Sequence, residues 1–372
     1  MRSGSRRSRL RPVAAAAIVL LATGIPRAAP SQEPAARGGV GIVRGVVEAG
    51  PGDPVPYAVV ALTPRFTQRF TDEAGVFSFS RVPPGTYHLV ARQVGFKPLD
   101  TTVVVAANQT LAVTAILERL TVELEVITIV ATRGCTQPGP PDEAGSPELA
   151  ALFEQLKQNA QRYKLLATTY QFRYRMARTF TDLDEMGNVA WTRGDTVEYV
   201  SSALTHYRPG EVLSVASLPD GTTTRAVVLP TLNDLADSVF QAHHCFSLAG
   251  RVEQDGNDVV RFHFRPADSL QAPDMEGDVD LDPRSYQIRR ARINLTHADQ
   301  AQEGMRSATS TITFAELLPN IVVQKRVESV QVLAEPVRQL GGAKHIARYV
   351  EDQQLADYHF LRPLPGRQDP SP

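Results

Sequence analysis

The sequence has 372 residues, which leaves room for two domains, and its 42% hydrophobic content is enough for packed cores. The formal net charge is −1, but residues 1–29 hold six arginines and no acidic residue. Without them, 33 basic and 40 acidic residues remain, a net charge of −7. Nucleic-acid binding depends on Lys and Arg neutralising phosphates, so this balance argues against a nucleic-acid partner.

The N-terminus is predicted to direct export. Arginines precede an apolar stretch from Pro12 to Ile25, and the small residues Ala28 and Ala29 follow it. This order is typical of a secretory signal peptide, here residues 1–29. The stretch is shorter than the roughly 20 residues of a membrane-spanning helix, so no transmembrane span is expected after cleavage, with an uncleaved anchor as the alternative. Residues 30–40, rich in Pro, Ala and Gly, predict a disordered linker.

Residues 41–131 predict a mainly β fold, a seven-stranded β-sandwich. In the run from Thr71 to Val90, turn residues alternate with short strands, and Phe77 and Phe79 share one strand face. Turns at such short intervals between β-branched segments are typical of a sandwich. Similar segments bounded by Gly, Pro, Asp or Asn occur at residues 42–48, 57–63, 67–70, 101–106 and 111–117.

This region resembles the carboxypeptidase regulatory-like domain, a transthyretin-like sandwich of exported bacterial proteins. The resemblance implies a module that accompanies enzymes and outer-membrane receptors and has no activity of its own. Residues 124–131 are also similar to the segment before the plug of TonB-dependent receptors, with a last edge strand as the alternative. The matching positions are Val43 to Val47, Pro56 to Val60, Thr71, Asp72, Gly75, Phe77, Pro83, Gly85, Tyr87, Gly95 and Phe96.

Residues 147–362 predict an α+β domain, in which an antiparallel sheet packs on a helix. Ser146 is expected to cap a helix that begins at Pro147. Two-residue periodicity then runs from Tyr170 to Leu333 and indicates an antiparallel meander. Further helices are predicted at Asn233 to Gln241 and Ile346 to Tyr358. Residues 132–146 predict a Pro/Gly linker and residues 363–372 a disordered tail.

Segments of this second region resemble exported bacterial proteins that join a carboxypeptidase regulatory-like domain to such a sheet. The segments are residues 240–246, 262–266 and 273–282. Residues 277–282 are also similar to a hairpin of lipoprotein-carrier-like half-barrels. Asp280 departs from that pattern, where a large apolar residue is usual, which puts the packing of the sheet there in doubt.

The two cysteines, Cys135 and Cys245, predict a disulfide, because an exported protein with one cysteine pair favours an intramolecular bond. Two free thiols are one alternative. Another is a metal site formed by His243, His244 and Cys245. Adjacent residues on a strand point to opposite faces, which disfavours chelation by all three.

No sequence motif predicts catalysis. None of the eight His begins an HxxE or HExxH pattern, and GxSxG and P-loop motifs are absent, so no catalytic residue, metal or cofactor is predicted. Five carboxylates on alternate residues suggest either a Ca²⁺ site or a solvated outer strand face compensated by Arg289, Arg290 and Arg292. They are Asp274, Glu276, Asp278, Asp280 and Asp282.

The aromatic residues Trp191, Tyr170, Phe172 and Tyr174 are candidates for stacking on a sugar or lipid, with a core position as the alternative. The leading hypothesis is a non-enzymatic interaction or scaffolding protein of the bacterial periplasm or outer membrane, with an envelope protein or glycan as partner. Alternatives are a carbohydrate- or lipid-binding accessory protein, a TonB-receptor-related protein without the barrel, and a peptidase or hydrolase. Residues 40–131 alone are expected to fold.

Overall fold

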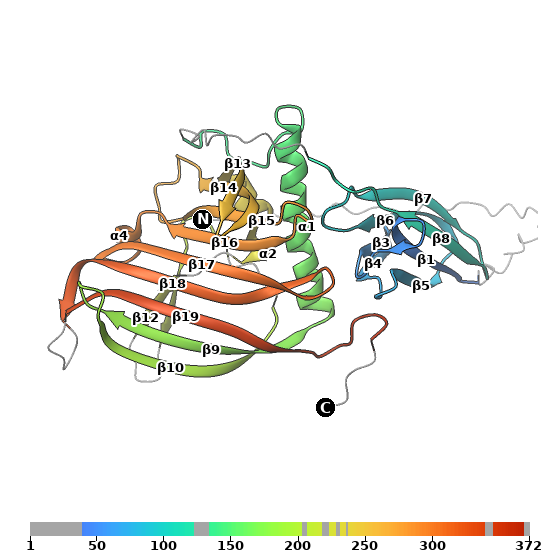
Figure 1. Cartoon of the computed structure of the whole chain (residues 1–372). Coiled ribbons are helices and arrows are strands. Elements are labelled where there is room, and N and C mark those ends of the chain that lie inside the picture. The colour runs from blue at the N-terminus through green and yellow to red at the C-terminus, as the bar shows by residue number, and fades with distance from the viewer. Residues whose placement is uncertain are drawn as a thin grey trace, which may run out of the picture. The chain divides into compact units, whose positions relative to one another are not determined.

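The computed structural model describes residues 39–122, 134–202, 207–217, 223–227, 231–235, 237–338 and 345–367. The predicted signal peptide, nearly all of the linker after it, the segment 124–131 and the last residues of the tail lie outside this part. The described chain is mainly β, with antiparallel sheets and one long helix (Figure 1). Both the sandwich and the later sheet predicted from the sequence are present.

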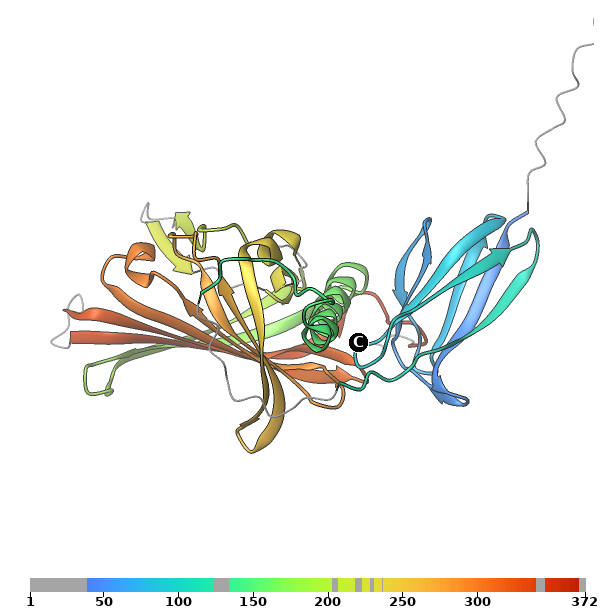
Figure 2. The same cartoon turned by 90° about the horizontal axis from the view of Figure 1, so that it is seen from above.

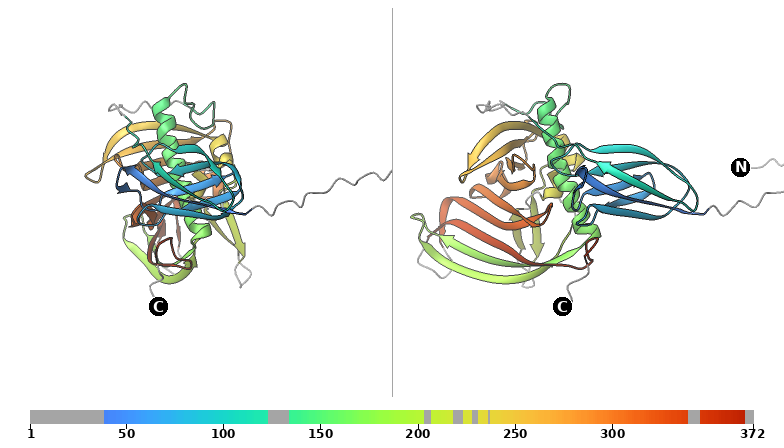
Figure 3. Two further views of the ribbon diagram at one scale, coloured as in Figure 1. Left: turned by 90° about the vertical axis from the view of Figure 1, so that its right-hand side faces the viewer. Right: turned by 45° about the vertical axis from the view of Figure 1, so that its right-hand side comes forward.

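The first region is a sandwich of two four-stranded sheets (Figure 3). One sheet has the order β2-β1-β5, with β8 pairing β1 in parallel, and the other has the order β4-β3-β6-β7. The sequence predicts seven strands and the structure has eight, because the two-residue strand β2 was not predicted. The strands are β1 (Gly41–Gly50), β2 (Asp53–Pro54), β3 (Val59–Thr63), β4 (Phe66–Phe70), β5 (Val76–Val82), β6 (Gly85–Arg92), β7 (Leu99–Val105) and β8 (Thr110–Ile116).

Local chemistry explains this part of the fold. The Asp72 carboxylate accepts hydrogen bonds from the backbone N–H of Ala74 (3.0 Å) and Val76 (2.8 Å), while Gly75 adopts a φ of 71° that favours glycine. Phe77 and Phe79 then point into the core between the sheets, as their two-residue spacing predicts. Thus the turn sets which residues of β5 face inward.

The second region contains a nine-stranded antiparallel sheet of order β10-β9-β19-β18-β17-β16-β15-β14-β13. A two-stranded hairpin, β11 (Leu213–Ser217) with β12 (Thr223–Val227), accompanies it. The long strands run side by side in Figure 1. They are β9 (Phe172–Leu183), β10 (Val189–Val200), β13 (His244–Gln254), β14 (Asn257–Pro266), β15 (Met275–Leu281), β16 (Ile288–Leu295), β17 (Met305–Leu318), β18 (Ile321–Arg338) and β19 (His345–Phe360).

The helices agree only in part with the sequence predictions. Helix α1 (Pro147–Thr169) begins with proline as predicted, but the Ser146 side chain makes no capping hydrogen bond. In place of one helix at residues 233–241 there are two short ones, α2 (Leu232–Leu235) and α3 (Ser238–His243), and α3 is capped by Asp237. A further short helix, α4 (Ala298–Ala301), precedes β17.

The predicted helix at residues 346–358 is wrong, because this segment is strand β19. It pairs with β18 on one side and β9 on the other, so backbone hydrogen bonds on both edges fix it as an interior strand. Several of its inward positions carry polar side chains, including Glu351 and Gln353. The alternation of apolar and polar residues that identifies a half-buried strand is therefore missing.

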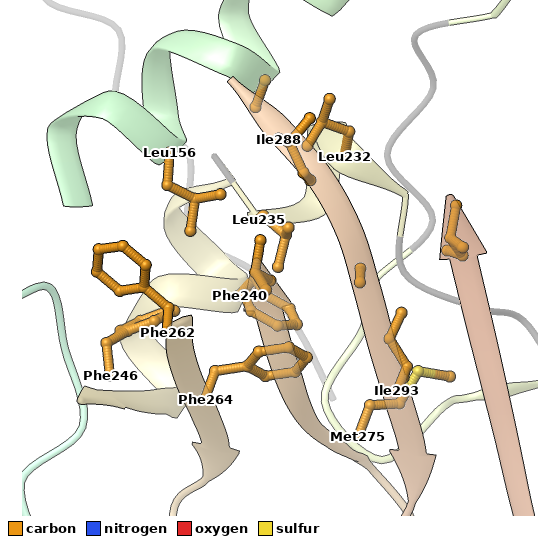
Figure 4. Close-up of a cluster of buried hydrophobic side chains, with 14 of the residues drawn as sticks. Leu156, Leu232, Leu235, Phe240, Phe246, Phe262, Phe264, Met275, Ile288 and Ile293 are labelled. Carbon is orange, nitrogen blue, oxygen red and sulfur yellow. The ribbon is translucent and has the colours of Figure 1, made fainter. Parts of the chain in front are cut away.

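The helices gather on one side of the sheet (Figure 2), and this side is called the inner face below. On β13 to β16 the inner face forms a hydrophobic core with α1, α2 and α3. Phe246, Phe262 and Phe264 cluster there with Phe240 of α3, and Met275 and Ile293 lie beside each other at one end of the cluster (Figure 4).

Arg162 of α1 links the sandwich to the sheet inside the compact unit that begins at Gly39. Its buried guanidinium donates to the backbone carbonyls of Tyr57 (2.9 Å) and Asn320 (2.6 Å) and to the side-chain oxygen of Gln93 (2.6 Å). It also lies 5.2 Å from the centroid of the Phe70 ring. Burial lowers the pKa of Arg162 to about 9, against a smaller opposing effect of Glu316, so the side chain stays charged at neutral pH.

Candidate ligand-binding site

The strand register places a set of side chains on the inner face beyond the helices. On β9, Phe180 lies opposite Arg193 of β10 and Glu351 of β19. Two residues further along β9, Asp182 lies opposite Trp191 of β10 and Tyr349 of β19. Residues two apart on a strand share a face, so these side chains form two adjacent rows across three strands.

These rows line a hollow of about 590 Å³ in the inner face. Buried apolar side chains from β15, β16 and β17 form an apolar wall of the hollow. Between this apolar wall and the two rows, β17 and β18 add the polar side chains of Ser310, Ser329 and Gln331. A volume of this size falls in the range of roughly 300–1,000 Å³ that is usual for small-molecule sites. The hollow thus joins an apolar wall that continues the core to a wall of aromatic and charged groups. The apolar residues are Met275, Ile293, Leu295 and Ala308.

Aromatic rings pack against Arg193, the cationic side chain that lines the hollow. The guanidinium carbon of Arg193 lies 4.4 Å from the centroid of the Phe180 ring and 5.7 Å from that of Trp191. Cation–π contacts of this kind orient a guanidinium and leave its N–H edges available. By contrast, Arg178 donates two hydrogen bonds to the carboxylate of Asp195, at 2.7 and 2.6 Å.

Two carboxylates lie in the same hollow. Burial raises the pKa of Asp182, and the nearby charge of Arg193 opposes that shift without reversing it. Burial also raises the pKa of Tyr349, with a further contribution from Asp182. The Glu351 carboxylate accepts a hydrogen bond from the side-chain amide of Gln353 (2.9 Å). The hollow therefore offers acceptors for a cation as well as donors for an anion.

The four aromatic candidates from the sequence do not form one platform. Trp191 lines the hollow and is 43% exposed. Phe172 is buried and contacts Tyr174 at a centroid distance of 5.9 Å, so both belong to the packing around α1. Tyr170 packs against Phe70 of the sandwich at 5.3 Å. Of the four predicted residues, the structure thus places Trp191 at the hollow and the other three elsewhere.

Sequence reasoning missed five residues of the hollow, namely Phe180, Asp182, Arg193, Tyr349 and Glu351. Trp191 and Arg193 are two residues apart in the sequence, and residues two apart share a strand face. This spacing was the available signal for the wall of aromatic and charged groups. No local signal pointed to Tyr349, because its segment reads as a helix and becomes part of the site only through pairing with β9.

Another cluster of ionisable groups is centred on two buried side chains. His244 and Asp274 are fully buried and lie 3.5 Å apart, Nε2 to Oδ1. The Tyr207 hydroxyl donates to Asp274 (2.9 Å), and burial raises the pKa of Tyr207. The His244 ring stacks on Phe240 at 3.9 Å, and both ring nitrogens face backbone carbonyls, of Phe240 and Met275. The contact of His244 with the Met275 carbonyl (3.1 Å) therefore ties the start of β13 to the start of β15.

The structure joins Cys135 and Cys245 in a disulfide, with a Cα–Cα distance of 5.6 Å, in agreement with the prediction. The segment around Cys135 runs along edge strand β13, and Gly139 N–H donates to the His244 carbonyl (2.9 Å). Across the described residues, no group of three or more His, Cys, Asp or Glu is arranged to hold a metal ion.

Val279 and Leu281 of β15 lie in the core, so the alternating carboxylates of this strand lie on its other face, as expected, but they are not all solvated. Asp280 is buried and accepts two hydrogen bonds from Arg261 of β14, at 2.7 and 2.9 Å. This ion pair explains how a charged residue replaces the expected apolar one. Arg292 and Arg290 lie opposite Asp278 and Asp280 across the hairpin, as expected. The ion pairs of Asp278 and Asp282 are with His263 and Arg289.

Comparisons with known proteins identify the sandwich. Residues 42–118 match the family model of the carboxypeptidase regulatory-like domain, so the chain carries such a domain. No curated protein matches the chain. Within the described residues, no helix has the length and apolar character to cross a membrane.

Solved structures show weak similarity. The minor pilin of Streptococcus agalactiae is 17% identical, with a TM-score of 0.20, 23% of this chain covered and 47% of the pilin. An outer membrane lipoprotein-sorting protein domain from Vibrio parahaemolyticus is 13% identical (TM-score 0.31), and a DUF1329 family protein from Desulfovibrio piger is 11% identical (TM-score 0.30). Each of these two matches covers 58% of this chain and 95% of the other.

Proposed function

We propose that this is an exported, non-enzymatic protein of the bacterial cell envelope that binds an amphiphilic ligand in the hollow of its nine-stranded sheet. The main observation in support of this proposal is the hollow of about 590 Å³, which has an apolar wall and a wall with Trp191 and Arg193. An acyl chain gains about 25 cal/mol for each Å² of apolar surface removed from water, and Met275, Ile293 and Leu295 offer such a surface. The carboxypeptidase regulatory-like domain supports an envelope role.

The hollow favours the lipid-binding alternative over carbohydrate binding. A sugar platform requires exposed aromatic rings, and within residues 39–122 every aromatic side chain is buried or half-buried. In the sheet, Trp191 does present an exposed ring, but it lines the same hollow as the apolar side chains of β15 to β17. We assign the sandwich the role of an interaction module for another envelope component.

Trp191 provides the readout for a test, because it is the one tryptophan of the sequence and lines the hollow. A soluble uncharged amphiphile, monolauroylglycerol, is titrated below its aggregation concentration. We expect a saturable blue shift of Trp191 emission, since the acyl chain displaces water from the ring.

Ala308→Phe should abolish the shift by filling the hollow from its apolar wall. Val104→Phe, at a 68% exposed position of the sandwich, is the matched control and should retain it. Circular dichroism verifies that both variants fold. The proposal fails if the folded wild-type protein shows no saturable change and calorimetry detects no binding.

A further inference from the structure

In the described part of the chain, the charged groups that line the hollow form no ion pair within 4 Å, although the charge of Arg193 opposes the rise in the pKa of Asp182 and helps to lower the pKa of Asp195. Among the described residues, no carboxylate forms an ion pair with Arg193, and no cation forms one with Asp182 or Glu351. The neighbouring Arg178 on the same face has its own carboxylate, Asp195. Arg193 is instead held by ring faces, and rings do not satisfy its five N–H donors.

The positions of these charges favour two separate contacts with one ligand. Arg193 is diagonal to Asp182 across the β9–β10 pair, and the backbone positions of diagonal neighbours are about 7–8 Å apart. Glu351 lies on the far side of Phe180 from Arg193, two strand spacings or about 10 Å away. A head group that lies between β10 and β19 therefore meets Arg193 on one side and Glu351 on the other, with Asp182 in the adjacent row.

We propose that the hollow selects an amphiphile with a zwitterionic head group. Arg193 binds its phosphate, Asp182 and Glu351 bind its ammonium group, and the acyl part lies against Met275, Ile293 and Leu295. This inference rests on the proposed function. It follows from charge complementarity: an anionic head group meets two carboxylates for one guanidinium, and a cationic head group meets Arg193.

The experiment compares ligands that differ in the head group. Phosphatidylethanolamine and phosphatidylglycerol with identical short acyl chains, monolauroylglycerol and free phosphoethanolamine are each titrated into the full-length protein. Binding is measured by calorimetry and by Trp191 emission. We expect phosphatidylethanolamine to bind about tenfold more tightly than phosphatidylglycerol, which corresponds to one charge-assisted contact.

Two variants test the sign of each contact. Arg193→Gln should lower the affinity for phosphatidylethanolamine and the affinity for phosphatidylglycerol by about tenfold each, because both lipids carry a phosphate. Asp182→Asn should lower the affinity for phosphatidylethanolamine, because this lipid has an ammonium group. The affinity for phosphatidylglycerol, which has none, should stay equal or rise. Arg173→Gln is the control, since Arg173 lies on the opposite face of β9, exposed and paired with Glu198.

The outcomes separate this inference from the proposed function. Equal affinity for all three lipids overturns head-group selection and leaves amphiphile binding intact. A failure of every lipid to bind overturns the proposed function. Binding of free phosphoethanolamine as tightly as the lipid overturns the role of the apolar wall, because the head group alone then accounts for the affinity.

Discussion

The sandwich and the nine-stranded sheet use the same strand alternation with different outcomes. In the sandwich, a second sheet covers the inner side chains, and Leu62, Phe79 and Leu89 are fully buried. In the large sheet, helices cover β13 to β16 and the end of β9, so Phe172 is buried while Phe180, eight residues along the same strand face, stays half-buried. An inward-facing side chain becomes core or binding surface according to what packs over it.

The composition of the two regions follows this difference. Sandwich positions that face inward are apolar, because an unpaired charge in a closed core costs several kcal/mol. The uncovered part of the large sheet tolerates Asp182, Arg193 and Glu351 on its inner face because water reaches them. The polar residues that obscured β19 in the sequence are thus the same residues that give the hollow its charge.

The disulfide gives the largest expected effect. Cys245→Ser should lower the free energy of unfolding of the sheet region by about 4–5 kcal/mol, the loop-entropy value for a loop of some 110 residues. The sandwich, which has no cysteine, should keep its stability. Denaturant unfolding followed by Trp191 emission reports on the sheet.

Alkylation of the denatured, unreduced protein is the independent check of the bond. Two labelled cysteines in the mass spectrum would show that the disulfide is absent from the exported protein. Equal loss of stability in the sandwich, measured by hydrogen exchange, would contradict the separation of the two regions.

The next largest effect contrasts a covered ring with an uncovered one. Phe79→Ala should cost about 3–5 kcal/mol of unfolding free energy, because the closed core cannot collapse around the cavity. Phe180→Ala should cost less than about 1 kcal/mol, since solvent fills the space. Thermal and denaturant unfolding measure both. Similar costs would show that the hollow is part of the core.

The junction at Arg162 should give an intermediate effect. Arg162→Met keeps the length of the side chain but leaves the Tyr57 and Asn320 carbonyls and Gln93 without their donor, which should cost about 2–4 kcal/mol. Lys164→Ala, an exposed position on the same helix, should change stability by no more than about 0.5 kcal/mol. Equal melting temperatures for the two variants would exclude a structural role for Arg162.

The smallest expected effect is pH-dependent and lies in the β15–β16 turn. Burial alone raises the pKa of Asp282, but the backbone N–H groups of Ser285 and Arg284 and the Arg289 guanidinium outweigh it and lower the pKa. Because the folded-state pKa is depressed, its stabilisation is complete above the unfolded value of about 4 and is lost as pH falls through the folded value.

Asp282→Asn should therefore cost about 1 kcal/mol at pH 7, and the difference from wild type should shrink as pH falls below about 4. Unfolding curves between pH 7 and pH 2.5 measure the difference. A difference that stays constant with pH would show that the carboxylate charge does not stabilise this turn.

The sequence alone was sufficient wherever local chemistry decides the structure. The turn at Asp72 and Gly75, the inward Phe77 and Phe79, and the helix start at Pro147 each follow from residues close in the chain. The pairing of Cys135 with Cys245 was also predictable, because an exported chain with two cysteines has one intramolecular combination.

Only the tertiary structure decided the site. The hollow requires β19 to lie between β18 and β9, which brings Tyr349 and Glu351 beside Phe180 and Asp182 from about 170 residues away. It also requires that the helices do not cover this part of the sheet, so that Trp191 and Arg193 stay accessible. Strand order and coverage depend on long-range packing, and neither leaves a periodic signal within a single segment.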